Sequence, residues 1–309
     1  MVQRIHWALA SRKGVLQRRA RILQETRRFF QDRGYLEVET PYRLPTVAPE
    51  SHIDPIPSED WFLHPSPELC MKRMLAAGYE KIFQICRCWR RGERGRLHHP
   101  EFTLLEWYRV GAGYKDLMEE CETFLRSLAA GLELGNLLTF RGRRIDLASP
   151  WERVTVKEAF RLYGEMTVEE ALRQGRFDEV MVERIEPRLG IGKPTFLYDY
   201  PSERRSLSRL KPEDPSVAER FELYLGGLEI ANAFTELNDP EEQRRVFQSE
   251  REARLLAGKE VYPMPEKFLE ELEAMPPSAG IALGVDRLVM VLLDATTIDE
   301  VVAFTPEDL

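Results

Sequence analysis

The chain has 309 residues, 43% of them hydrophobic and 31% charged, and a formal net charge of −8 at pH 7. This composition is typical of a globular protein with a large core and not of a disordered or repetitive chain. The acidic balance argues against a general nucleic-acid binder, because nonspecific affinity for phosphate backbones comes largely from clustered positive charge. No apolar run approaches the roughly 18 to 20 residues of a membrane span, and the apolar stretch at residues 5–10 is too short for a signal peptide, so we expect a cytoplasmic protein without a membrane anchor.

The N-terminal third is predicted to form a long helix, a short strand and a second helix. Apolar residues recur with helical spacing over residues 15–33, and Gly34 stands where such a helix would end. Residues 35–41 alternate like a strand up to Pro41, which has no backbone N–H to continue a ladder. After a proline-rich loop, a helix of about a dozen residues is predicted from the Ser66-Pro67 turn onward.

Residues 81–110 concentrate positive charge between two predicted strands. The segments KIFQICRCW and FTLLEWYRV both alternate like strands, so residues 90–101, which hold four arginines and two histidines, are most simply the connection of an antiparallel hairpin. Alternation along the second strand places Glu106 and Tyr108 on one face, beside the arginine-rich connection. Taken alone, such a connection is more often a solvated turn than a binding site.

The cysteines and histidines show none of the familiar metal or disulfide spacings. The four cysteines (Cys70, Cys86, Cys88 and Cys121) include no Cys-x-x-Cys pair, and the five histidines form no His-Glu-x-x-His. Sequence spacing therefore predicts neither a disulfide framework nor a zinc site, and we expect reduced, structural cysteines.

A second hairpin is predicted within residues 219–240. Gly226-Gly227 is a two-residue turn signal, because such turns need positive φ. Pairing across it sets Tyr224 opposite Glu229 and puts Glu222 on the face of Glu229, as a diagonal neighbour. Two adjacent carboxylates fit either a solvated face or a site for a divalent cation.

The last predicted unit, residues 278–294, is an apolar strand followed by a helix with Asp286 and Arg287 in its first turn. Gly284, at the junction, would let a flat ligand approach the backbone closely. The helical regions 114–131 and 155–186, on either side of the basic turn RGRRID, carry no recognisable chemistry and are expected to be scaffold.

Together these segments resemble the catalytic domain of a class II aminoacyl-tRNA synthetase of the lysyl type. The first helix, the strand and Pro41 resemble motif 1, residues 83–109 resemble motif 2, and residues 280–293 resemble motif 3, while HHPEFTLLEWY, EIANAFTELND and GVDR point to the lysyl branch. The resemblance implies an α+β fold with a mostly antiparallel sheet flanked by helices, as one domain over residues 1–309. The lack of a βαβ series with a Gly-rich phosphate loop agrees with this fold.

An anticodon-binding barrel is expected to be absent, because motif 1 begins near the N-terminus. This arrangement is similar to the elongation factor P lysyltransferase family, free-standing lysyl-synthetase paralogues that activate a lysine isomer with ATP and attach it to a lysine side chain of elongation factor P. The alternatives are a truncated lysyl-tRNA synthetase acting on tRNA and a catalytically silent paralogue that binds an amino acid or nucleotide.

The resemblance also implies roles for single residues. Arg90 on the α-phosphate and Arg287 at the γ-phosphate end are the expected catalytic residues, since negative charge builds on the phosphoryl oxygens during activation. Glu222 and Glu229 are expected to hold Mg²⁺. The full ATP-binding set is Arg90, Arg91, Gly92, Glu93, His98, His99, Glu229, Ile230, Gly284 and Arg287. The substrate, lysine or (R)-β-lysine, has two ammonium groups, which carboxylates bind well. The residues expected to bind it are Ser66, Pro67, Glu68, Glu106, Tyr108, Asn232, Glu236 and Ala282.

Three positions depart from the usual family pattern. Motif 2 usually reads Arg-Asn-Glu, but here Arg90 is followed by Arg91 and Gly92, and the glutamate is displaced to Glu93. An alignment with Arg91-Gly92-Glu93 as the motif restores Arg-x-Glu but shortens the loop before His98 by one residue. His99 stands where the family often has asparagine. Ala282 stands where lysyl synthetases generally have glycine, and its methyl group favours a β-amino acid over α-lysine.

The resemblance implies two macromolecular partners. One is elongation factor P, and the other is a second copy of the chain, because motif 1 makes the dimer interface of class II enzymes and corresponds here to residues 15–41. Transfer to tRNA is expected to be poor, because an acidic chain offers few positive groups to neutralise its phosphates.

Overall fold

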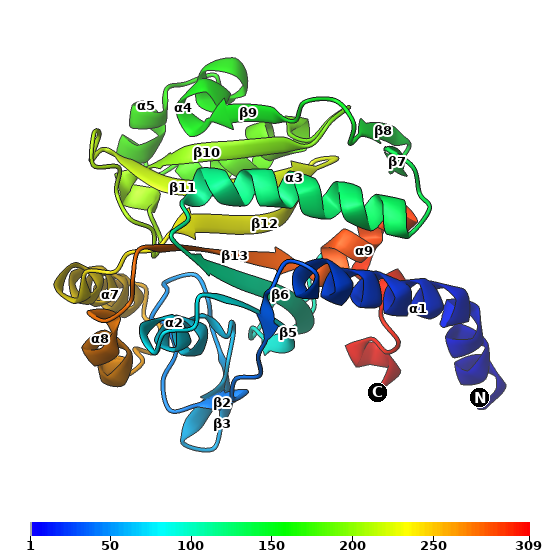
Figure 1. Ribbon diagram of the computed structural model, residues 1–309, viewed down its shortest axis with the longest axis horizontal. Helices are drawn as coiled ribbons and strands as arrows, with labels where there is room; N and C mark the ends of the chain where they lie inside the picture. The colour runs from blue at the N-terminus through cyan, green and yellow to red at the C-terminus, as the bar shows by residue number, and fades with distance from the viewer. Residues whose placement is uncertain (1) are drawn as a thin grey trace.

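The structure, a computed structural model, describes residues 2–309, with side chains from residue 9 onward. Within these residues the fold is built around one eight-stranded sheet in the order β1-β5-β6-β13-β12-β11-β10-β9 (Figure 1). The strands from β5 to β10 in that order pair antiparallel, and the edge strands β1 and β9 pair parallel. The predicted α+β fold with a mostly antiparallel sheet is therefore confirmed.

The strands of this sheet are β1 (Leu36–Glu37), β5 (Lys81–Trp89), β6 (Glu101–Val110), β9 (Glu152–Thr155), β10 (Thr195–Pro201), β11 (Val217–Leu225), β12 (Leu228–Thr235) and β13 (Ser278–Gly284). A smaller sheet contains β2 (Arg43–Leu44), β3 (Ile56–Ser58) and β4 (Trp61–Leu63), and a separate hairpin contains β7 (Leu137–Phe140) and β8 (Arg143–Asp146). The helices are α1 (Val2–Gln31), α2 (Glu68–Ala76), α3 (Tyr114–Gly131), α4 (Val156–Ala159), α5 (Val168–Arg173), α6 (Phe177–Val180), α7 (Pro240–Leu256), α8 (Glu266–Leu272) and α9 (Val285–Leu293).

Helices α1, α3 and α9 pack with the large sheet into the main hydrophobic core (Figure 1). Phe30 of α1 stacks on Phe83 of β5 with ring centroids 4.9 Å apart, and it also contacts Trp107 of β6 at 5.0 Å. Because side chains alternate along a strand, Trp107 points into this core while Glu106 and Tyr108 point to the other face of the sheet. That second face is where polar groups can meet a ligand.

The remaining helices gather at the two ends of the sheet. Helices α2, α7 and α8 share a second core with β5 and β6, and α4, α5 and α6 pack with β9, β10 and β11. Within residues 2–309 we find no helix with both the length and the apolar character needed to cross a membrane.

The structure corrects several local predictions. Helix α1 begins at Val2, well before the predicted residue 15, and β1 is limited to two residues. The basic segment predicted as a turn is a hairpin, in which Arg141 and Gly142 have positive φ angles of 51° and 72° and β8 follows. Strands β9 and β10 were not predicted, because they pair with each other across about 40 residues of chain. Strands β2, β3 and β4 were not predicted either, because two or three residues are too few to show alternation.

The β11–β12 hairpin follows the predicted pairing at its turn and departs from it further along. Gly226 and Gly227 have φ angles of 63° and 80°, and Tyr224 pairs with Glu229 as expected. A bulge then shifts the register, so that Glu222 lies directly opposite Asn232 instead of residue 231. The extra residue brings the Asn232 side chain beside Glu222 on the second face of the sheet.

Candidate active site

A cavity of about 270 Å³ lies on the second face of the sheet, over β6, β13 and β12. Its floor is a row of directly paired residues, Glu106, Ala282 and Asn232, which continues to Glu222 on β11. In the next row Gly280 lies between Tyr108 and Phe234, and a β-carbon on Gly280 would stand 2.2 Å from the Tyr108 ring. Glycine is therefore required there by close approach.

Carboxylates gather at one end of the cavity. Ser66 donates a hydrogen bond to Glu106 at 2.6 Å, and the Tyr108 hydroxyl donates to the other oxygen of Glu106 at 3.0 Å. The buried Lys72 ammonium bridges Glu68 and Glu236, at 2.5 Å from an oxygen of each. Lys72 thus pairs with two carboxylates, while Glu106 contacts two hydroxyl groups, which leaves negative charge for a cationic ligand.

Burial makes the carboxylates at this end easier to protonate. It raises the pKa of Glu106 well above its ordinary value, and the nearby Glu68 raises it further. Burial also raises the pKa of Glu236, although the positive charge of Lys72 acts in the opposite direction. For Lys72 itself burial lowers the pKa, but the negative charges of Glu236 and Glu68 outweigh this effect and raise it. Glu50, a lining residue that sequence reasoning missed, has its pKa raised to about 7 by burial and by Glu68. An ammonium group bound here would favour the charged forms.

Cationic and imidazole groups gather at the other end. Arg287 donates to the backbone oxygen of Glu229 at 2.9 Å and to its carboxylate at 3.1 Å, and it also contacts His98. Burial and the charge of Arg287 lower the pKa of His98, which favours the neutral ring. The guanidinium carbon of Arg90 lies 5.0 Å from the centroid of the Phe102 ring. A nitrogen of the same guanidinium is 4.0 Å from a carboxylate oxygen of Glu93. This end suits a polyanion.

A cluster of carboxylates adjoins the basic end. The Glu222 carboxylate accepts hydrogen bonds from Arg220 at 2.7 Å and from the Tyr224 hydroxyl at 2.6 Å. Burial and the charge of Glu229 raise the Glu222 pKa, which indicates that the two carboxylates are close. Glu186, which sequence reasoning also missed, has its pKa raised to about 7 by burial, Glu222 and Glu229. Such mutual repulsion among oxygen ligands is what a hard divalent cation relieves.

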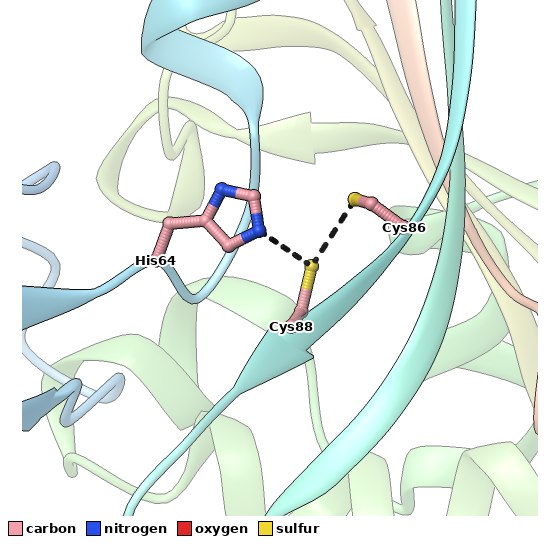
Figure 2. Close-up of side chains that lie close together, drawn as sticks. All are labelled: His64, Cys86 and Cys88. Atoms are coloured by element: carbon pink, nitrogen blue, oxygen red, sulfur yellow. Dashed lines mark hydrogen bonds between the residues drawn. The ribbon is translucent and has the colours of Figure 1, made fainter. Parts of the chain in front are cut away.

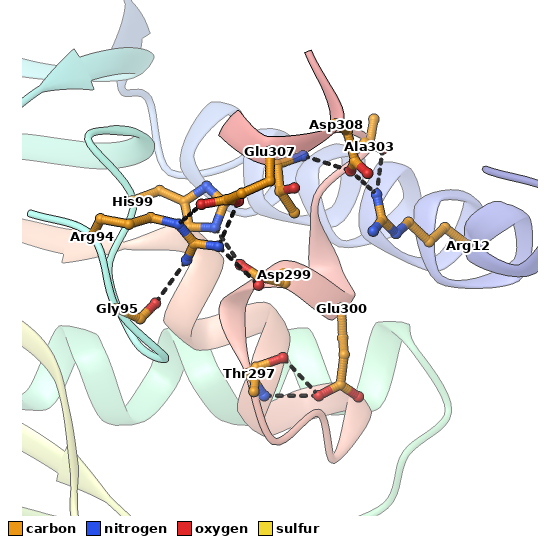
Figure 3. A network of polar contacts seen from close by, with 11 residues as sticks. Arg12, Arg94, Gly95, His99, Thr297, Asp299, Glu300, Ala303, Glu307 and Asp308 are labelled. Atoms are coloured by element: carbon orange, nitrogen blue, oxygen red, sulfur yellow. Dashed lines mark hydrogen bonds and ion pairs between the residues drawn. The ribbon is translucent and has the colours of Figure 1, made fainter. Parts of the chain in front are cut away.

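The connection between β5 and β6 is held by the C-terminal segment (Figure 3). Arg94 pairs with Asp299 at 3.0 Å and with Glu307 at 2.8 Å, and a ring nitrogen of His99 lies 2.6 Å from Asp299. Arg12 of α1 in turn pairs with Asp308 at 2.7 Å. The C-terminal segment therefore fixes the loop that carries the arginines next to the cavity.

The structure brings most of the predicted site residues to this cavity. The lining residues among them are Ser66, Glu68, Arg90, Glu93, His98, His99, Glu106, Tyr108, Glu229, Ile230, Asn232, Ala282, Gly284 and Arg287. Residues of the predicted sets that lie outside the lining are Pro67, Arg91, Gly92, Glu222 and Glu236.

These outlying residues have different surroundings. Glu222 and Glu236 are buried directly behind the lining, in contact with Arg220 and Lys72 respectively. Gly92 adopts a positive φ of 81°, and the backbone N–H of Arg91 donates to Asp54 at 2.6 Å. Of the missed residues, Lys72 had a detectable signal, because it follows Glu68 by four positions on a predicted helix.

Comparison with known families matches residues 4–308 to the family described as tRNA synthetases class II (D, K and N). The chain therefore belongs to the class II synthetase family, in agreement with the antiparallel sheet and the cavity on its second face. Three curated relatives named Elongation factor P--(R)-beta-lysine ligase match over nearly the whole length. The protein of Erwinia tasmaniensis is 39% identical, with 97% of each chain covered.

The relative from Proteus mirabilis is 37% identical over 96% of this chain and 97% of its own. The relative from Salmonella gallinarum is 38% identical, with 94% of each chain covered. Within the class II family the chain thus belongs with the Elongation factor P--(R)-beta-lysine ligases, and it is an enzyme of the ligase type.

Proposed function

We propose that this protein activates lysine or (R)-β-lysine with ATP as an adenylate and transfers it to a lysine side chain of elongation factor P. The observation that carries the proposal is the polarity of the cavity, with carboxylates around Glu106 at one end and Arg90 and Arg287 at the other. A ligand with ammonium groups at one end and phosphates at the other matches this distribution. The names of the three relatives support the same acceptor.

In the first step a carboxylate oxygen of the substrate attacks the α-phosphorus of ATP. The new oxygen–phosphorus bond forms while the bond from the α-phosphorus to pyrophosphate breaks. Arg90 and Arg287 stabilise the negative charge that grows on the phosphoryl oxygens, and the enzyme gains most of its rate from this electrostatic effect and from alignment. Glu106, Glu68 and Glu236 hold the ammonium end. The carboxylates Glu222, Glu229 and Glu186 fit Mg²⁺, which when bound would supply positive charge beside the phosphates.

In the second step the ε-amine of the acceptor lysine attacks the activated carbonyl carbon. The new amide bond forms as the bond to AMP breaks, and the amine loses its proton. No covalent enzyme intermediate is needed, so the reaction requires no cysteine or serine nucleophile. The cavity floor at Ala282 carries a methyl group in the row between Glu106 and Asn232, and this methyl favours a β-amino acid by about 1–3 kcal/mol at most.

The acceptor is tested by incubating the full-length protein, ATP and radiolabelled lysine or (R)-β-lysine with elongation factor P and, separately, with total tRNA. We expect label on elongation factor P and its loss when the acceptor lysine is changed to alanine. Label on tRNA alone would favour the tRNA ligase alternative. Failure of ATP–pyrophosphate exchange with every lysine isomer would favour a silent binding paralogue.

Glu229→Gln should raise the Mg²⁺ concentration needed for half-maximal exchange by about 10-fold or more, because a carboxylate charge is removed from the proposed cation site. High Mg²⁺ should restore much of the rate. The matched control is Glu101→Gln, an exposed carboxylate on β6. An unchanged Mg²⁺ dependence in Glu229→Gln would remove this residue from the proposed site.

The pH dependence of kcat/KM for the amine substrate should show an acid limb below about pH 7. The carboxyl groups of Glu50, Glu106 and Glu236 have raised pKa values, so they become neutral as the pH falls and their attraction for ammonium groups is lost. In Glu50→Gln one of these titrating groups is gone, and the fall between pH 8 and pH 6 should be shallower. A profile parallel to that of the wild type would exclude Glu50 from substrate binding.

We also propose a homodimer through residues 15–41. In support, β1 is an edge strand of the large sheet, Leu36 on it is 51% exposed and Tyr42 beside it is 47% exposed. An apolar edge of this kind is stabilised by covering it. Sedimentation should give a dimer at assay concentrations, and Leu36→Glu should shift it towards monomer. An active monomeric wild-type protein would disprove this interface.

A further inference from the structure

His64, Cys86 and Cys88 form a buried cluster of metal-ligand side chains beside the cavity (Figure 2). The sulfur atoms of Cys86 and Cys88 are 3.8 Å apart, and Nε2 of His64 is 3.9 Å from the sulfur of Cys88. His64 and Cys88 are fully buried, and Cys86 is 4% exposed. Both cysteines are free thiols.

The fold brings these three residues together from two segments. Cys86 and Cys88 are two positions apart on β5, so their side chains point to the same face of the strand. His64 follows β4, and two backbone hydrogen bonds fix its position. Its N–H donates to the backbone oxygen of Tyr42, and its own backbone oxygen accepts from the N–H of Trp89. The cluster is therefore pre-organised by backbone pairing, independently of any ligand.

The spacing of the three ligand atoms suits a tetrahedral metal. Bond lengths of about 2.3 Å to sulfur and about 2.0–2.1 Å to imidazole nitrogen place neighbouring ligands roughly 3.6–3.8 Å apart in a tetrahedron. The Cys86–Cys88 and Cys88–His64 separations of 3.8 and 3.9 Å are close to these values, and all three ligand atoms lie within 4.8 Å of one another. Nε2 of His64 donates a hydrogen bond to the backbone oxygen of Arg87 at 2.8 Å, so a metal ion bound at Nε2 would take the place of this N–H and lie beside the Arg87 oxygen.

We propose that His64, Cys86 and Cys88 bind one zinc ion, at a site separate from the proposed ATP and Mg²⁺ positions. Two thiolates and a neutral imidazole neutralise a divalent cation, which removes the cost of burying its charge. On binding, the two thiols release their protons and the ion replaces the proton on Nε2, which moves to Nδ1. In the metal-free protein Nδ1 is buried and has no hydrogen-bond partner within the described residues.

A zinc ion bound at this site would stabilise the segments that form the acidic end of the cavity. None of the three ligands lines the cavity, but Cys86 and Cys88 pair across β5 and β6 with the lining residues Leu104 and Phe102. His64 immediately precedes the loop that carries Ser66 and leads into α2, whose first residue is Glu68. A metal ion here would fasten that loop to β5, and because His64 and Cys88 are fully buried we expect its role to be structural.

The test uses the full-length protein, purified with reductant and chelator and then titrated with Co²⁺, which reports thiolate ligation and tetrahedral geometry by its absorption. We expect charge-transfer and d–d bands that saturate at one Co²⁺ per chain and are displaced by Zn²⁺. Zn²⁺ should also raise the Tm of the wild-type protein. These readouts do not depend on catalytic activity.

Cys88→Ser and His64→Gln should weaken Co²⁺ binding by on the order of 100-fold or more, because even residues that only support a metal ligand change affinity by about 10- to 100-fold. Cys121→Ser is the matched control, since Cys121 is also fully buried but lies in the main core. Absence of the bands in reduced wild-type protein would overturn the proposal, as would bands that persist in Cys88→Ser. A native mass two hydrogens below that of the reduced chain would instead identify a Cys86–Cys88 disulfide and also overturn it.

Discussion

Arg287→Ala is expected to lower kcat/KM for lysine-dependent ATP–pyrophosphate exchange by about 10²- to 10³-fold, the usual effect of removing one group that stabilises transition-state charge. The guanidinium stands at the start of α9 and is held by the backbone oxygen and the carboxylate of Glu229. It is therefore pre-oriented towards the cavity before any ligand binds. The measurement is steady-state exchange with ATP and amine varied independently.

Two variants make this test specific. Arg287→Lys keeps the charge but loses the planar fork, so we expect it to recover a small part of the rate. Arg144→Ala removes an exposed arginine on β8 and should leave exchange unchanged. If Arg287→Ala stays folded and keeps its kcat/KM within about threefold of the wild type, this residue has no role in charge stabilisation.

Glu106→Gln should raise KM for the amine substrate by about 10- to 100-fold and leave KM for ATP nearly unchanged, because a charge-assisted hydrogen bond contributes about 1.5–3 kcal/mol. Glutamine keeps the size of the side chain in the row with Ala282 and Asn232. The amide oxygen of glutamine accepts hydrogen bonds but its NH₂ group does not, so one of the two hydrogen bonds that Ser66 and Tyr108 donate to Glu106 is also lost.

The control for this variant is again Glu101→Gln on the same strand, which should behave as the wild type. Circular dichroism and Tm separate a binding defect from a folding defect, since Glu106 is 1% exposed. Equal increases in KM for ATP and for the amine would show a general distortion of the cavity and would contradict a role for Glu106 in holding the ammonium group.

Local patterns predicted those parts of the fold that depend on neighbours in the chain. Alternation located β5 and β6, and Gly226-Gly227 located the β11–β12 turn with its first residue pair. The same alternation placed Glu106 and Tyr108 on one face. Local patterns failed for β9 and β10, whose pairing joins segments far apart, and for the bulge that moves Glu222 opposite Asn232.

Residue identity also determined the chemistry of the cavity in outline, because arginines, carboxylates and a glycine at a strand end are recognisable in the motifs that contain them. The site residues themselves remain predictions until the variants are measured. Glu50 and Glu186 had no signal in the sequence, because what makes them notable is a raised pKa caused by burial and by carboxylates from other segments of the chain.

Motifs along the chain predicted the class II family by resemblance, and local periodicity predicted the antiparallel strands β5 and β6. Both depend only on residues close together in the chain. The tertiary structure decided which groups meet. His64 lies more than twenty positions from Cys86, and no spacing rule joins them, yet a backbone hydrogen bond from Trp89 to His64 holds the segment after β4 against the end of β5 and brings their side chains together. Contact between distant segments depends on sheet order and burial, which are properties of the whole fold rather than of any segment.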